Sequence, residues 1–336
     1  MASRIKMNDI AQEFGVSTVT VSKALTGKDG VSAELRAAIK KKAGEMGYVH
    51  NRLPQNILRG RSYNIGILIA ARYLGESTFY WKFYQKLLDS LKKTDYLGIL
   101  EIVGEEDEIQ CDAPAFIDAH KVDGVILLGQ LSNAYLTMIT KKMPCCVFLD
   151  FYSEIGEADC VASNNFLGSY NLTKLLIDAG HQKIAFIGST SATTSILDRY
   201  MGFCKAMLEA GLSYDNALED RDARGFYTDI PLHLEKYTAY VCNNDHVAGI
   251  VIRQLRACAA MVPDDISIVG FDNEGLAVTD GVGVTSLEVN IASMCNNALS
   301  YVIQHIENEH YTPHGRSFID GTVVVKQSIK PRTGYK

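Results

Sequence analysis

The N-terminal part of the chain has the hydrophobic spacing of three short helices. In "MNDIAQEF", near 7–14, apolar residues recur at intervals of three and four, which places them on one helix face. Ser17 and Ser32 are good N-caps for two further helices, and Gly27 and Gly47 follow as stop signals. The pattern predicts three helices around a small core that is only marginally stable alone.

From Ile65 onward the pattern changes to short, continuous apolar runs. "NIGILIA", "VDGVILLG", "KIAFIGS" and "DISIVGF" are typical of buried strands, and amphipathic stretches such as "WKFYQKLLDSLKK" and "RYMGFCKAMLEAG" lie between them. This alternation predicts parallel sheets with helices on both faces. About seven such strands fit two α/β subdomains better than one. Ligands of such folds bind beyond the C-terminal ends of the strands.

A polar, basic stretch, "YVHNRLPQNILRGRSYN" at 48–64, lies between these two parts. Asn51 could cap a short helix there, with Pro54 in the first turn, where the missing N–H costs little. The stretch has so little apolar surface that we expect it to stay largely unfolded until it binds something.

The net charge of −6 conceals an asymmetry between the two ends of the chain. Residues 1–62 hold eleven Lys and Arg against five acids, a balance of +6, so the remainder carries −12. A basic head on an acidic body indicates that the head meets a polyanion while the body has another task.

The cysteines and the N-terminus predict the compartment. The eight cysteines are scattered and form no C-x-x-C pair, which favours buried thiols in a reducing cytosol over a disulfide framework. No apolar run reaches the roughly 18 residues of a membrane span, and the N-terminus lacks the apolar core of a signal peptide. We therefore expect a cytoplasmic protein with no membrane partner.

The second predicted helix, in "GVSTVTVSKAL", has the features of a DNA-reading element. A helix, a glycine turn and a second helix form the helix-turn-helix pattern, whose second helix enters the major groove. Val16, Val21 and Leu25 should face the core, which leaves short side chains that can approach base edges closely. The alternative is a small helix packed against the body, with Val19 half-buried. The residues predicted to face outward are Thr18, Val19, Ser22 and Lys23.

"MNDIAQEFGVSTVTVSKALTG", with "VSAELRAAIKKKAGEMGYVHN" after it, resembles the N-terminal domain of LacI/GalR-family transcription regulators. The resemblance continues through "NRLPQNILRGRSYNIGILI", "LIDAGHQKIAFIG", "CNNDHVAG" and "VPDDISIVGFDN" in the family's order. It implies an all-α helix-turn-helix head and an α/β body of two periplasmic-binding-protein-like, Rossmann-like lobes. The implied parts are the head (1–47), a hinge-helix linker (48–62), lobe one (63–161 with 292–321) and lobe two (162–291 with 322–336).

The resemblance also implies a sequence-specific repressor that binds a pseudo-palindromic operator in double-stranded DNA as a homodimer or a higher oligomer. Linker helices would meet in the minor groove, where Ile57 matches the apolar wedge that kinks the central base step. Pro54 departs from the family's usual small residue, and Lys23 stands where arginine is common. The candidate DNA contacts are Ser17, Thr18, Val19, Thr20, Ser22, Lys23, Asn51, Ile57 and Leu58.

A small effector is implied between the lobes. Carboxylates, an amide and one arginine suit hydrogen bonding to vicinal hydroxyls, which favours a sugar. Each carboxylate has a structural alternative, because Asp245 and Asp272 could cap a helix or a turn. Phe151 keeps a purine-type corepressor open, and the aromatic run 79–81 could stack on a sugar or pack into the core. The candidate effector contacts are Phe79, Tyr80, Trp81, Asp150, Phe151, Arg199, Phe226, Asn244, Asp245 and Asp272.

Two other classes of protein compete with this interpretation. Paired carboxylates could hydrolyse glycosides, but no G-x-S-x-G or P-loop motif is present. His305, His310 and His314 are spaced too loosely for a convincing metal site. A transport-type sugar-binding protein would share the body, but not the basic head. We therefore predict a regulator with no catalytic residue, metal or cofactor.

Overall fold

The structure is a computed structural model that describes residues 5–27, 29–48, 61–75, 78–222, 225–275 and 282–332. The chain divides into two compact units, Met1–Ser62 and Tyr63–Lys336. We call them the head and the body and describe each by itself. Among the described residues, no helix combines the length and the apolar character needed to cross a membrane.

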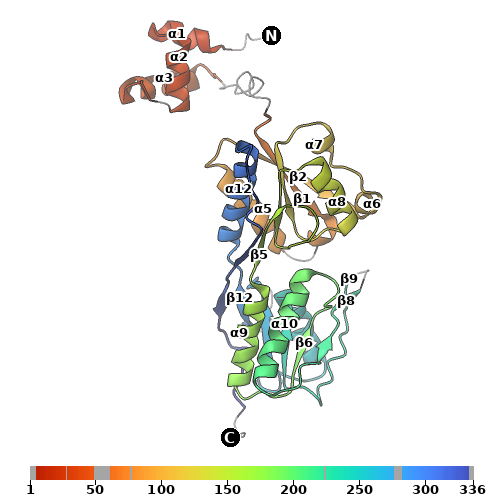
Figure 1. The fold of residues 1–336 in the computed structure, drawn as a ribbon. Coiled ribbons are helices and arrows are strands. Elements are labelled where there is room, and N and C mark those ends of the chain that lie inside the picture. Colours follow the sequence, from red (N-terminus) through yellow and green to blue (C-terminus); the bar gives the residue numbers. More distant parts are fainter. Residues whose placement is uncertain are drawn as a thin grey trace. The chain divides into compact units, whose positions relative to one another are not determined.

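The head contains the three predicted helices, α1 (Met7–Phe14), α2 (Thr18–Thr26) and α3 (Ala33–Glu45) (Figure 1). Their fully buried side chains are few and small, namely Ile10, Ala11, Val21, Ala24, Ile39 and Ala43. A core of this size explains why each helix also needs its own cap. The serine hydroxyls that precede α2 and α3 both accept a backbone N–H, as the sequence predicts.

The first sheet of the body has the strand order β13-β5-β4-β3-β1-β2, and all its strand pairs are parallel. Its strands are β1 (Asn64–Ala70), β2 (Leu97–Val103), β3 (Gly124–Leu128), β4 (Cys146–Leu149), β5 (Asp159–Ser163) and β13 (Arg316–Ile319). The strands are continuous apolar runs because helices cover both faces of the sheet.

Two groups of helices cover this sheet. Helices α5 (Phe79–Leu91) and α12 (Ile291–Glu307) pack side by side on the face that holds Ile65, Ile67 and Ile69 (Figure 1). Helices on the other face share a core with Leu68 and Val125. These remaining helical segments of lobe one are η1 (Ala71–Tyr73), α6 (Glu105–Gln110), α7 (Ala115–Asp118) and α8 (Asn133–Lys142).

The second sheet has the order β14-β12-β11-β10-β6-β7, in which only the β12–β14 pair is antiparallel. Its strands are β6 (Ile184–Ile187), β7 (Ala217–Leu218), β10 (Ala239–Cys242), β11 (Ser267–Phe271), β12 (Thr285–Glu288) and β14 (Thr322–Val324). A small antiparallel pair, β8 (Arg221–Asp222) and β9 (Gly225–Phe226), lies outside this sheet.

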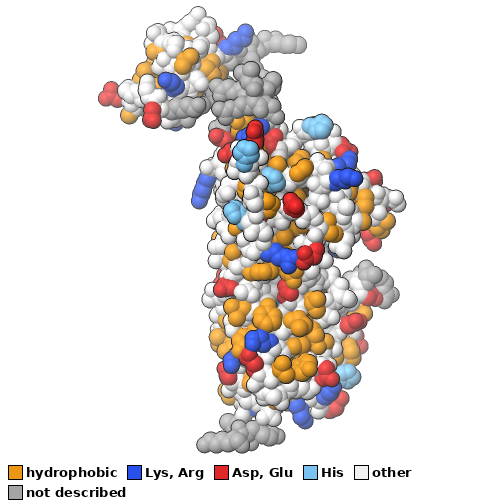
Figure 2. Space-filling model, in the orientation of Figure 1, with side chains coloured by type: hydrophobic (Ala, Val, Ile, Leu, Met, Phe, Trp, Pro, Cys, Tyr) orange, Lys and Arg blue, Asp and Glu red, His pale blue; other side chains and the backbone are white. Residues whose placement is uncertain are grey.

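The second sheet is also covered on both faces. Helices α9 (Asn165–Asp178) and α10 (Thr194–Glu209) pack on one face, and α11 (Asp245–Ala257) packs on the other. Figure 2 shows hydrophobic side chains gathered on the outer side of the α9–α10 pair, where Phe166, Leu197 and Met201 are exposed. The outer side of this helix pair is therefore only partly polar.

The chain passes between the two lobes three times. The first passage follows β5, the second precedes α12, and the third joins β13 to β14. The predicted boundaries at 161 and 291 are slightly wrong, because β5 continues to Ser163 and α12 already begins at Ile291. The chain changes lobe only after its last ladder hydrogen bond, and a resemblance in sequence does not locate that bond.

Candidate functional site

The start of α2 is set by a side-chain cap. The Ser17 hydroxyl accepts a hydrogen bond from the Thr20 backbone N–H at 3.1 Å, and the two hydroxyl oxygens lie 2.9 Å apart. Gly15 and Gly27 flank the helix with φ of 61° and 79°, a conformation that glycine adopts without strain. Local chemistry therefore positions a helix that has weak intrinsic propensity.

The two faces of α2 are divided as the sequence predicts. Val21 is fully buried, and Val16 and Leu25 pack at the rim of the core. Val19 is 62% exposed, and Thr18 and Lys23 are exposed beside it, while Thr20 and Ser22 are half-buried. The outer face thus offers methyl groups, hydroxyls and one cation, which suit thymine methyls, base edges and phosphates. Asn51, Ile57 and Leu58 lie outside the described residues.

In the body, two carboxylates stand at the ends of strands from different lobes. Asp150 follows β4 and Asp272 follows β11, with φ of 70° and 88°. Their backbone N–H groups donate to the carbonyls of Val161 and Leu287, each at 2.8 Å. Left-handed backbone costs about 1–2 kcal/mol for most residues. Asp tolerates it, and such strain is typical of functional positions.

A buried arginine, Arg199 of α10, lies beside these carboxylates and is 6% exposed. Its Nε donates to Asn165 Oδ1 at 2.7 Å and its Nη1 to the Asn243 carbonyl at 2.6 Å. Its Nη2 lies 3.5 Å from Asp272 Oδ1. The guanidinium carbon lies 3.7 Å from the centre of the Phe271 ring. These contacts therefore fix the position of the guanidinium.

Asp150 has one satisfied and one unsatisfied oxygen. The Tyr80 hydroxyl donates to Asp150 Oδ2 at 3.0 Å, whereas Oδ1 is buried and has no hydrogen-bond partner among the described residues. Tyr80 packs on Tyr73, with ring centres 4.8 Å apart. Buried acceptors are nearly always satisfied in folded proteins. Asp150 Oδ1 is therefore the atom in this cluster that a ligand would most directly satisfy.

Burial dominates the electrostatics of this cluster. It raises the pKa of Asp150 to about 7; Arg199 opposes this shift, while Asp272 adds to it. It raises the pKa of Asp272 to about 6, against Arg199 and with a contribution from Glu274. Lys82 and Arg221 lower the pKa of Asp272 only as minor effects. Asp272 thus adds to the effect of burial on Asp150, and Glu274 adds to the effect of burial on Asp272, even beside an arginine.

Two of the predicted effector contacts are already used within the protein. Asn244 is the N-cap of α11, and its side-chain oxygen accepts the Val247 N–H at 2.9 Å. Asp245 is buried and accepts from the Ser286 hydroxyl at 2.7 Å and from the Glu274 N–H at 2.9 Å. Both residues therefore have structural roles, and their assignment to effector binding stays a prediction. They fasten the start of α11 to the neighbouring loop and strand.

The predicted aromatic contacts also separate. Phe79 packs in the core against Phe83, with ring centres 5.1 Å apart. Trp81 is 38% exposed and contacts Tyr84 edge-on. The ring of Phe79 is thus part of the core and that of Trp81 lies beside Tyr84, and stacking of either ring on an effector stays a prediction. Of the run 79–81, the structure brings only Tyr80 to Asp150.

Phe151 and Phe226 lie in different surroundings. Phe151 is 1% exposed and stacks on Phe148 at 4.9 Å, and it also lines the hollow between the lobes described below, so its assignment as an effector contact stays a prediction. Phe226 lies beneath the Arg221 guanidinium, 4.1 Å from ring centre to Cζ, and beside His246. It lines a separate hollow of about 460 Å³ along α11.

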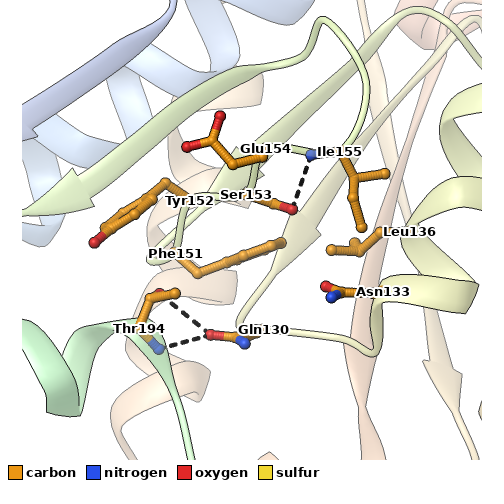
Figure 3. A pocket seen from close by; sticks show the side chains of 9 residues that line it. All are labelled: Gln130, Asn133, Leu136, Phe151, Tyr152, Ser153, Glu154, Ile155 and Thr194. Atoms are coloured by element: carbon orange, nitrogen blue, oxygen red, sulfur yellow. Dashed lines mark hydrogen bonds between the residues drawn. The ribbon is translucent and has the colours of Figure 1, made fainter.

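A second hollow, of about 270 Å³, lies where the lobes meet (Figure 3). Gln130 of lobe one accepts hydrogen bonds from the backbone N–H and the hydroxyl of Thr194, at 2.9 and 3.2 Å. Nearby, the Tyr152 hydroxyl donates to Asp198 Oδ1 at 2.9 Å. These bonds join residues of lobe one to residues of lobe two. The remaining lining residues are Asn133, Leu136, Phe151, Ser153, Glu154 and Ile155.

Sequence reasoning missed the residues that position the cluster. Asn165 and Asn243 hold Arg199, Tyr73 supports Tyr80, and the Ser195 hydroxyl donates to the Asp150 carbonyl at 3.3 Å. Asn165 and Asn243 each come just after a strand, in "ASNN" and "VCNN". The rule that polar residues at strand ends meet at one edge could have found Asn165, whereas Asn243 acts through its backbone carbonyl, which every residue has.

The head and the body together define a class of protein, a DNA-binding regulator that carries a ligand-binding body. Residues 6–51 match the model of bacterial regulatory proteins of the lacI family, and residues 173–329 match a periplasmic binding protein-like domain. The chain is 32% identical to the HTH-type transcriptional regulator RegA of Clostridium saccharobutylicum, over 81% of this chain and 83% of RegA. The chain belongs to the lacI family and is a DNA-binding transcriptional regulator.

Other relatives and solved structures agree with this assignment. The HTH-type transcriptional repressor PurR of Vibrio campbellii is 27% identical over 96% of this chain and 98% of its own. The transcriptional regulator CelR–cellobiose complex superposes with a TM-score of 0.70 at 23% identity, over 97% of this chain and all of CelR. The lac repressor dimer bound to operator superposes with a TM-score of 0.75 at 18% identity. The superposition covers 98% of this chain and all of the lac repressor chain. These two structures share the fold.

The division of α2 into two faces leads to a paired prediction. Val19→Ala should leave the melting temperature unchanged, because the lost methyl groups are exposed. It should weaken binding to an operator that the full chain selects from random duplexes. Val21→Ala should cost about 2 kcal/mol of unfolding free energy, because it leaves a cavity in a small core. Calorimetry of the head transition and fluorescence-anisotropy titration would check both. Equal loss of operator and random-DNA affinity in Val19→Ala would contradict a base contact.

The raised pKa values lead to a pH prediction. The unfolded pKa of Asp is about 3.9, so Asp272, with a folded pKa of about 6, holds its proton more tightly in the folded state. Its contribution to stability is present below about pH 4 and is lost as the pH rises through about 6. Asparagine tolerates the same φ as aspartate. The Asp272→Asn substitution should therefore raise the melting temperature by about 4 °C at pH 8 and by almost nothing at pH 4.

The control for this experiment is Asp118→Asn. Asp118 is exposed at the end of α7 and pairs with Lys142 at 2.9 Å, so its removal should change the melting temperature little at either pH. If the melting temperatures of Asp272→Asn and the wild type differ by the same amount at every pH from 4 to 8, this result would contradict a raised pKa of the Asp272 carboxyl.

Proposed function

We propose that this regulator is a repressor that binds a pseudo-palindromic operator as a homodimer and responds to a sugar held between its lobes. The observation that carries the sugar proposal is the cluster of Asp150, Arg199, Asp272 and Tyr80, with its one unfilled buried acceptor. Carboxylates and a fixed arginine provide the directional acceptors and donors that vicinal hydroxyls require.

DNA reading is assigned to the outer face of α2. The balance of +6 over residues 1–62 supplies a sequence-independent attraction to phosphates. Val19, Thr18 and Lys23 would then contact bases and phosphates in one half-site, and a second copy would read the other half-site about one helical turn away. In this proposal Asn51, Ile57 and Leu58 contribute from the linker, with Ile57 as the minor-groove wedge. The operator-bound lac repressor dimer, which has the same fold, supports this arrangement.

A sugar is favoured over a purine as the effector. The sequence keeps a purine open through Phe151, whose ring stacks on Phe148 and lines the hollow between the lobes. The CelR structure with cellobiose shows that the same fold accommodates a sugar.

Control by effector would act through the junction of the lobes. Gln130–Thr194 and Tyr152–Asp198 are hydrogen bonds between the lobes, so a ligand that adds contacts to both lobes shifts the balance between conformations that keep or break these bonds. Coupling of this kind is typically about 1–3 kcal/mol and is reciprocal between effector and DNA.

Selection of duplexes from a random library by the full chain, followed by titration with neutral sugars, tests the proposed function. We expect a two-fold symmetric sequence, two chains per duplex, and an operator affinity that changes by about 5-fold or more with one sugar. A single half-site bound by one chain would contradict the dimer. Operator binding that no sugar alters would contradict the effector.

Arg199→Lys provides the matched variant for this test. Lysine keeps the charge but loses the fork that reaches Asn165, Asn243 and Asp272 together. The variant should bind the operator as the wild type does and lose the response to sugar. Operator binding serves as the internal check that the variant is folded. A full response to sugar would remove Arg199 from the effector site.

A further inference from the structure

We infer that an ion pair of lobe one, Arg72 with Glu108, positions the hydrogen bond that Gln130 makes to lobe two. Through this bond the pair affects the balance between arrangements of the lobes, although neither residue belongs to the carboxylate cluster. The regulatory consequence rests on the proposed function, whereas the positioning itself is measured without an effector.

Glu108 of α6 is a buried acid, only 6% exposed. Both of its carboxylate oxygens accept hydrogen bonds from Arg72 of η1, because Nη1 donates to Oε2 at 2.5 Å and Nη2 donates to Oε1 at 3.3 Å. Oε1 also accepts the backbone N–H of Ser132, which precedes α8, at 2.6 Å. Glutamate is rarely buried unless it is paired in this way. The carboxylate therefore fastens three segments of lobe one to one another.

The same arginine holds the backbone of Gln130. Arg72 Nη2 donates to the Gln130 carbonyl at 2.8 Å, and the Tyr73 hydroxyl donates to this carbonyl at 2.7 Å. Two donors thus use both lone pairs of one carbonyl oxygen. Together with the bond from Ser132 to Glu108, these contacts fix the segment 130–132 at both of its ends. A guanidinium can reach a carboxylate and a carbonyl at once because its donors form a rigid fork.

The fixed backbone directs the Gln130 side chain to lobe two (Figure 3). Its Oε1 accepts the N–H of Thr194, the first residue of α10, at 2.9 Å. An N–H at this position has no partner within its own helix, whereas the Ile196 N–H donates to the Thr193 hydroxyl within lobe two at 3.2 Å. A glutamine side chain loses much rotamer freedom when it makes such a bond. A fixed backbone therefore strengthens the bond, because it leaves less freedom to be lost.

The ion pair is also connected to the carboxylate cluster. The Arg72 guanidinium carbon lies 5.0 Å from the centre of the Tyr73 ring, and this ring packs on Tyr80, whose hydroxyl donates to Asp150. Both tyrosine rings lie close to Gly129, where an added Cβ would come within 2.9 Å of Tyr73 and 3.1 Å of Tyr80. The bond between the lobes and the donor to Asp150 therefore depend on the same short segment, η1.

Hydrogen–deuterium exchange of the full chain, resolved to single residues, tests the positioning. The Thr194 N–H reports the bond between the lobes, and the Ile196 N–H, which is capped within lobe two, is the internal reference. Glu108→Gln removes the charge that holds the arginine, and Arg72→Lys keeps a cation beside the buried carboxylate but loses the fork. We expect exchange about 5-fold faster at Thr194 and unchanged at Ile196 in both variants, since a hydrogen bond contributes a factor of this order. Arg72→Lys decides the test should Glu108→Gln not fold.

Two further variants complete this experiment. Gln130→Ala removes the acceptor itself and should accelerate exchange at Thr194 at least as much. Asp118→Asn, which removes an exposed pair with Lys142 in the same lobe, should change neither amide. Acceleration in Gln130→Ala alone would overturn the inference, because the ion pair would then be irrelevant to the bond. Equal acceleration at Thr194 and Ile196 in the ion-pair variants would overturn it as well, because the pair would then act on general stability. No acceleration in Gln130→Ala would overturn it too.

The regulatory consequence is measured by titrating the operator complexes of the wild type and Arg72→Lys with glucose, ribose, trehalose and cellobiose. A sugar that changes the operator affinity of the wild type should change that of the variant by a factor at least about 3-fold smaller, because residues that contact neither ligand can alter the coupling between two sites. An equal factor in both proteins would overturn the regulatory role. If no sugar changes the operator affinity of the wild type, the sugar proposal fails, while exchange at Thr194 still decides whether the ion pair positions Gln130.

Discussion

The burial of Arg199 is the constraint on which the ligand-binding body depends. A guanidinium taken out of water is tolerated only when its donors meet acceptors. Here the acceptors come from three different segments: Asn165 at the start of α9, the Asn243 carbonyl after β10, and Asp272 after β11. A single side chain thus joins the ends of separate elements at one edge of the second sheet. The same contacts leave a fixed positive charge beside Asp150, which belongs to the other lobe.

The placement of polar groups follows from the parallel sheets. All the strands of the first sheet, and all but β14 of the second, run parallel to their neighbours, so their carboxyl ends meet at a common edge. Asp150 and Asp272 come from two such edges, and the three passages of the chain connect the lobes on which they stand. The site is therefore assembled from both lobes and is sensitive to any change in their arrangement.

The head is stabilised by a small core and by helix caps. Its six fully buried side chains include three alanines, so the core contributes little stability, and caps at Ser17 and Ser32 add to it. Small side chains on the inner face of α2 let it pack closely against α1 and α3, and those on the outer face suit the close approach to DNA that we propose. Valine occurs on both faces of α2, with Val21 on the buried face and Val19 on the exposed face.

Much of the architecture follows from the sequence because it depends on local periodicity. The three helices of the head, the caps at Ser17 and Ser32, and the alternation of strands and helices are encoded over a few residues each. What only the tertiary structure decided was which polar and aromatic groups remain available. Asn244 and Asp245 are neighbours in the chain, and nothing local shows that one caps α11 and the other binds Ser286. Phe79 and Tyr80 are also adjacent, yet one ring enters the core and the other reaches Asp150. These outcomes depend on partners that lie far away in sequence, and their satisfaction is a property of the folded body alone.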